Sequence, residues 1–175
     1  MPESPASPAA EPTAGVRILR FQRLLFGGVY GTVLASSLAS ALENDHGQPD
    51  PGYDALWILV ACLTAAAAHG YAYAISHWNP GERTVTGLTL RSTLTEWPLV
   101  AAAVPTLFAL LGAHAGWWPE NTAISVVLVI NTAALFCWGL AAARVAGQSW
   151  GSATRVGGVD VLIGLVIIAV NAASH

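Results

Sequence analysis

Several side chains that can exchange protons or bind a polar ligand fall within long apolar runs of the sequence, or at the ends of such runs. These residues are Tyr30, His69, Tyr73, His77, Glu96 and Asp160. Histidine titrates near neutral pH. Polar groups inside a membrane segment cost free energy and are rare, so each one needs a structural or functional explanation. Such groups could bind a proton together with a small cationic or lipophilic substrate. They could equally provide general acid–base catalysis, with Glu96 or Asp160 as the acid and His69 or Tyr73 as its partner.

Helical spacing puts some of these groups on common faces and at similar depths. His69, Tyr73 and His77 follow one another at intervals of four residues, which places them on one face of a helix. Asn131 lies near the middle of another apolar run. Because polar side chains in membrane helices usually face the bundle interior, we expect these seven residues to converge on a pocket open to the cytoplasm.

Each residue also has a purely structural alternative. Glu96 and His77 could face water in the headgroup layer, and Asp160 could pair with Arg155 at the interface. His69 and Asn131 could form hydrogen bonds between helices, and the two tyrosines could be packing residues.

Composition identifies the elements that must position these groups. The 175 residues are 54% hydrophobic and only 10% charged, whereas soluble domains carry about 25% charged residues. The apolar runs cover residues 24–42, 55–76, 97–117, 122–146 and 156–174, and each is long enough to cross about 30 Å of hydrocarbon as a helix. The sequence therefore predicts an all-α membrane bundle of about five helices. Residues 1–16, rich in proline, alanine and serine, are expected to be a disordered tail before a single transmembrane domain, residues 17–175.

The positive charges predict the orientation of the bundle. The chain has seven arginines and no lysine, at positions 17, 20, 23, 83, 91, 144 and 155. With five spans all of them fall on one side, and the positive-inside rule makes that side cytoplasmic. We therefore expect a bacterial plasma membrane protein with its amino terminus inside and its carboxyl terminus outside. An alternative is a cleaved signal peptide that ends near Ala39-Ser40-Ala41.

Small residues and prolines predict how the helices pack. Gly27, Gly31, Ala35 and Ala39 form a ridge at intervals of four, which permits close helix contact within the bundle or a homo-oligomer through the Gly27/Gly31 face. Pro98 falls in the first turn of the third expected helix, and Pro105 should kink that helix.

Three functional hypotheses remain open on these grounds. The leading one is small-molecule binding or transport through the polar pocket, in a protein whose constant partner is the lipid bilayer. The alternatives are an intramembrane enzyme acting on an isoprenoid or lipid, and an accessory subunit of a membrane complex. The net charge of −3 argues against a nucleic-acid partner. No metal-ligand or cofactor motif is present, so we expect no metal and no cofactor.

Five short segments resemble a family of proteins. They are VYGT at 29–32, AHGYA at 68–72, EWPL at 96–99, GLAAAR at 139–144 and AGQSW at 146–150. Together they are similar to a set of small, largely uncharacterised multipass membrane proteins of actinobacteria. The resemblance implies a multipass membrane protein and brings no established activity or catalytic residue. The family often has a lysine near the end of its last helix, where this chain has Asn171.

Overall fold

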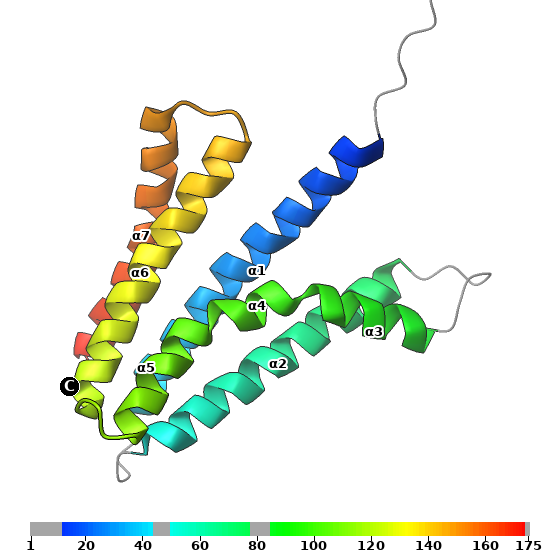
Figure 1. Ribbon diagram of the computed structural model, residues 1–175. Coiled ribbons are helices and arrows are strands. Elements are labelled where there is room, and N and C mark those ends of the chain that lie inside the picture. The colour runs from blue at the N-terminus through cyan, green and yellow to red at the C-terminus, as the bar shows by residue number, and fades with distance from the viewer. Residues whose placement is uncertain (1–11, 44–49, 78–84, 174–175) are drawn as a thin grey trace, which may run out of the picture.

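The computed structural model describes residues 12–43, 50–77 and 85–173, and these residues form helices and connecting turns without a strand. The helices are α1 (Pro12–Glu43), α2 (Pro51–Ser76), α3 (Val85–Thr95), α4 (Trp97–Ala102), α5 (Val104–His114), α6 (Glu120–Val145) and α7 (Trp150–Ala173) (Figure 1). Helices α1, α2, α6 and α7 are each long and apolar enough to cross a membrane, and the bent pair Thr89–Ala102 and Val104–His114 adds a fifth candidate span when it is counted as one. The predicted all-α membrane bundle is confirmed, with four or five candidate spans where about five are expected.

Several predicted helix boundaries differ from the observed ones. Helix α1 begins at Pro12, so residues 12–16 of the expected tail are helical, while residues 1–11 lie outside the described chain. Its 32 residues extend about 48 Å, more than the hydrocarbon core requires. The part before the candidate span Phe21–Leu42 therefore extends beyond the core. Helix α7 begins at Trp150 instead of residue 156.

The third expected helix is divided into separate pieces by its prolines. Pro98 lies in the first turn of α4 and Pro105 in the first turn of α5. Because proline has no N–H to donate to the preceding turn, the chain bends by 53° between the two, and the predicted kink is confirmed. The segment before Trp97 was expected to be a loop, but residues 85–95 form helix α3. Helix α3 packs alongside α2.

The ridge of small residues on α1 is used inside the bundle. Gly27 and Gly31 face α4, and a Cβ at Gly27 would lie only 2.9 Å from the backbone nitrogen of Leu99. Gly28 faces the indole of Trp138 on α6. Of the two roles predicted for the Gly27/Gly31 face, contact within the bundle is the observed one. Helix α4 covers this face, and the homo-oligomer stays a prediction.

The helix ends gather at two opposite ends of the bundle. The amino-terminal half of α1, the α6–α7 turn and the α3 end of α2 lie toward one end. The carboxyl-terminal end of α1, the start of α2 and the α5–α6 connection lie toward the other (Figure 1). Arg23, Arg91, Arg144 and Arg155 belong to the first group, which we call the arginine end. The opposite end holds Asp50 and His114, whose carboxylate oxygen and ring nitrogen lie 3.9 Å apart. Arg83 lies outside the described residues.

Candidate functional site

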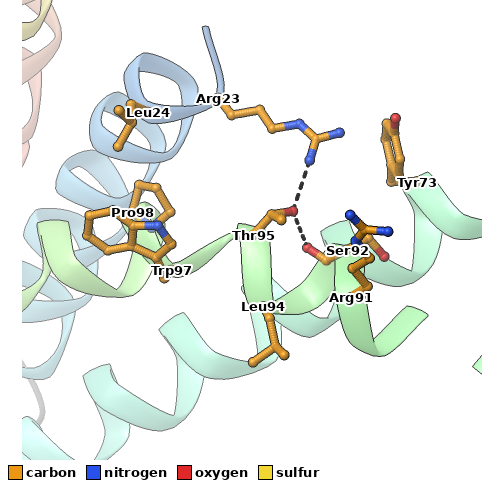
Figure 2. A pocket seen from close by; sticks show the side chains of 9 residues that line it. All are labelled: Arg23, Leu24, Tyr73, Arg91, Ser92, Leu94, Thr95, Trp97 and Pro98. Atoms are coloured by element: carbon orange, nitrogen blue, oxygen red, sulfur yellow. Dashed lines mark hydrogen bonds between the residues drawn. The ribbon is translucent and has the colours of Figure 1, made fainter. Parts of the chain in front are cut away.

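A cavity of about 650 Å³ lies at the arginine end, where α1, α2, α3 and α4 meet (Figure 2). This volume is typical of small-molecule sites. The residues that line the cavity are Arg23, Leu24, Tyr73, Arg91, Ser92, Leu94, Thr95, Trp97 and Pro98. Two of them are cationic, three carry hydroxyl groups and four are apolar.

Arg23 connects three of the helices that surround the cavity. Its Nη1 donates a hydrogen bond to Oγ1 of Thr95 on α3, at 2.9 Å. Its guanidinium carbon also lies 4.6 Å from the ring centroid of Tyr73 on α2, within the range of a cation–π contact. Figure 2 shows the arginine reaching from α1 toward these two side chains. Both of these partners are electrically neutral, so neither offsets the positive charge.

The close packing of α3 on α2 forms the polar floor of the cavity. Gly70 has no side chain, and a Cβ there would lie 2.5 Å from the backbone nitrogen of Thr93. This close approach lets the Ser92 hydroxyl donate to the Gly70 carbonyl at 2.7 Å. The Thr95 hydroxyl donates to the Ser92 carbonyl at 2.6 Å. Both hydroxyl groups therefore donate their hydrogen bonds to backbone carbonyl oxygens. The side-chain donors left for a ligand are N–H groups of the two guanidiniums, the Tyr73 hydroxyl and the indole N–H of Trp97.

The other side of the cavity is apolar. Leu24 and Pro98 face it from α1 and α4, while Leu94 and Trp97 border it with 68% and 60% of their surfaces exposed. The described lining includes no aspartate or glutamate. Glu96 lies between two lining residues in sequence and is half-buried, yet it is not among the residues that line the cavity. The site is therefore cationic and polar on one side and apolar on the other.

No family model, curated protein or solved structure matches the chain. The resemblance to actinobacterial membrane proteins therefore stays a prediction, and the function must be argued from the site itself.

Four of the predicted site residues, on α1 and α2, form two pairs of contacting rings. The rings of Tyr30 and His69 have centroids 5.0 Å apart, and Phe26 lies 5.4 Å from the same histidine. One turn farther along α2, Tyr73 stacks on His77 at 4.2 Å. Of these residues only Tyr73 lines the cavity. Tyr30 on α1 therefore meets His69 on α2, while Tyr73 and His77 pair with each other at the end of α2 that borders the cavity.

The other three predicted residues, Glu96, Asp160 and Asn131, lie elsewhere, so the expected convergence of all seven on one pocket is not observed. Asp160 packs against Gly139, in the seam between α6 and α7. Asn131 is fully buried and donates a hydrogen bond to Oγ1 of Thr106 on α5, at 2.9 Å. This contact is the interhelical hydrogen bond weighed as the alternative for Asn131. Among the described residues, no three His, Cys, Asp or Glu side chains are grouped to hold a metal ion.

The prediction missed the residues that give the cavity its charge. Arg23 and Arg91 were used only to assign the sides of the membrane, and the helix that carries Arg91 and Thr95 was expected to be a loop. A sequence signal for this site existed. Arg91 and Thr95 are four residues apart and would therefore share one face of a helix. They come directly before Trp97 and Pro98, where the third apolar run begins.

Proposed function

We propose that this multipass membrane protein binds a small anionic molecule in the cavity between α1, α2, α3 and α4. The observation that carries the proposal is that two guanidinium groups border one cavity whose described lining contains no carboxylate. Arginine suits anion recognition because its charge is permanent and its planar fork can donate two parallel hydrogen bonds to a carboxylate or phosphate.

The surroundings of the guanidinium groups should strengthen their binding of an anion. Arg23 contacts only neutral described partners, the Thr95 hydroxyl and the Tyr73 ring. Neighbouring apolar walls lower the local dielectric, which strengthens an ionic contact compared with one in bulk water. Both contacts also hold the Arg23 side chain across the cavity before any ligand arrives, which reduces the ordering cost of binding.

This proposal keeps the predicted class of function but changes the ligand. A cationic substrate would require carboxylates, and the predicted ones do not line the cavity. The acid–base enzyme is less well supported, because both candidate acids, Glu96 and Asp160, lie outside the cavity. Of its candidate partners, Tyr73 lines the cavity and His69 does not. By the positive-inside rule, the arginine end would face the cytoplasm of a bacterium, with the carboxyl terminus outside.

Binding can be tested with a water-soluble probe and a matched uncharged control. Protein in nanodiscs of neutral lipid would be titrated with glycerol 3-phosphate or with glycerol, and binding measured by calorimetry. We expect glycerol 3-phosphate to bind and glycerol not to bind. Arg91→Gln should weaken binding about tenfold or more, the usual effect of losing one charged hydrogen bond.

Arg144→Gln is the control substitution. Arg144 lies at the same end of the bundle, but it donates to the Gln148 carbonyl and stacks on Trp150 instead of lining the cavity. Its replacement should leave the affinity unchanged. Absence of binding by the wild-type protein, or equal affinity in the Arg91→Gln variant, would contradict the proposal.

A further inference from the structure

The polar and apolar sides of the cavity lie at different depths along the membrane spans. Arg23 lies two residues inside the start of the α1 candidate span, and Tyr73 lies three residues before the end of the α2 span. At 1.5 Å per residue these groups are within about 5 Å of the span ends. Arg91 is likewise two residues after Thr89, where the bent span begins. All three belong at the level of the lipid headgroups.

The apolar side of the cavity begins at Leu24 and Leu94, close to the arginines in sequence, and extends deeper at Trp97 and Pro98. Trp97 is eight residues after Thr89, about 12 Å farther along the helical path. More than half of the surface of Leu94 and of Trp97 is exposed, and at this depth the exposed surface of a membrane helix faces hydrocarbon chains. The cavity therefore changes from cationic to apolar in the same direction as a membrane lipid changes from headgroup to chain.

From this juxtaposition we infer that the ligand is a lipid phosphate, whose phosphate contacts Arg23 and Arg91 while its hydrocarbon chain leaves the cavity over Leu94 and Trp97. This inference rests on the proposed function and adds the chemical class of the ligand and its route. The cavity, at about 650 Å³, has the volume of a small-molecule site, so it takes the headgroup while the chain remains in the bilayer. A water-soluble phosphate shares the headgroup chemistry but makes no use of the apolar side.

Three probes separate the contributions of phosphate and chain. Native mass spectrometry of the protein in uncharged detergent would measure binding of phosphatidic acid, of diacylglycerol with the same chains, and of glycerol 3-phosphate. We expect one phosphatidic acid per protein, bound at least about tenfold more tightly than glycerol 3-phosphate. Burial of two methylene groups alone is enough for about that factor. Diacylglycerol should not bind at the site.

Two tryptophan variants test the route of the chain. Trp97→Ala should weaken the binding of phosphatidic acid severalfold and leave the affinity for glycerol 3-phosphate unchanged. Trp57→Ala is the matched control, because Trp57 is an exposed tryptophan of α2 that does not line the cavity. It should change neither affinity.

The outcomes distinguish the two proposals. If glycerol 3-phosphate binds as tightly as phosphatidic acid and Trp97→Ala has no effect, the ligand is a soluble anion. The lipid inference then fails while the proposed function stands. If diacylglycerol and phosphatidic acid bind with equal affinity, and Arg91→Gln changes neither affinity, the phosphate plays no part in binding. Both proposals then fail. If none of the three probes binds, both fail as well.

Discussion

The contact between α1 and α4 gives a stability prediction that can be worked out from the structure. A methyl group at Gly31 would overlap the Leu99 carbonyl oxygen and would lie 3.0 Å from both the Leu99 carbonyl carbon and the Ala102 Cβ. The obstacle is largely backbone, one turn before the bend near Ala103, so it cannot be relieved by rotating a side chain. Overpacking of this kind typically costs about 1–3 kcal/mol.

A second glycine provides the reference for this measurement. Replacing any helical glycine by alanine also changes helix propensity, by roughly 0.5–1 kcal/mol in favour of alanine. Gly158 on α7 has nothing within 4 Å of the position of a Cβ, so Gly158→Ala reports the propensity gain alone. Subtracting one variant from the other removes this gain, and we expect Gly31→Ala to be less stable than Gly158→Ala by about 1–3 kcal/mol.

The assay is reversible unfolding by SDS in mixed micelles, followed by circular dichroism. Movement of α4 would also displace Trp97 and Pro98 from the apolar side of the cavity, so binding of phosphatidic acid should weaken in the Gly31 variant only. If the two alanine variants differ by less than about 0.5 kcal/mol, the cost of overpacking is absent and the described α1–α4 contact is wrong.

Three further predictions concern other contacts. In a double-mutant cycle, Asn131→Ala and Thr106→Val should show a coupling of roughly 0.6–1.7 kcal/mol in SDS unfolding, the range for hydrogen bonds within membranes, and zero coupling would contradict the observed bond. Asp50 accepts hydrogen bonds from the N–H groups of Gly52 and Tyr53 at 3.1 Å. Thermal unfolding should therefore show a loss of about 1 kcal/mol for Asp50→Ala and little change for Asp50→Asn; equal losses would assign the effect to the charge opposite His114. Gly70→Ala should push α3 away from α2 and weaken glycerol 3-phosphate binding in calorimetry, whereas Gly151→Ala, with open space around it, should not; equal affinities would show that the α2–α3 contact does not shape the cavity.

The sequence was sufficient for the features of the fold that depend on one segment at a time. Length and lack of charge identified the spans, because a chain crossing hydrocarbon must satisfy its backbone groups within a helix. Proline chemistry located the bend before Pro105, because the missing N–H acts at that residue whatever the neighbours are. Helix α3 was missed because its segment contains Arg91 and several threonines, and its helical state depends on packing against Gly70 of α2.

The composition of the site could not be predicted in the same way. Spacing shows which face and depth a side chain has, but it does not show which helices are neighbours. His69 and Tyr30 were correctly expected to lie together, since both point into the same seam. Asp160 was expected in this group as well, yet Gly139 on α6 provides the space its carboxylate occupies. Arg23 belongs to the site because α3, which packs closely on α2 at Gly70, carries Thr95 within hydrogen-bonding distance of its guanidinium.

The central claim, an anion-selective cavity at the arginine end, is tested most directly by the charge preference of a thiol placed inside it. Thr95→Cys, in a background with Cys62 and Cys137 replaced by alanine, would be reacted with an anionic and a cationic methanethiosulfonate of similar size. Each rate would be divided by the rate of the same reagent with a free thiol in solution. The account predicts faster reaction with the anionic reagent, a preference reduced by Arg91→Gln and not by Arg144→Gln. Equal or faster reaction with the cationic reagent would contradict it.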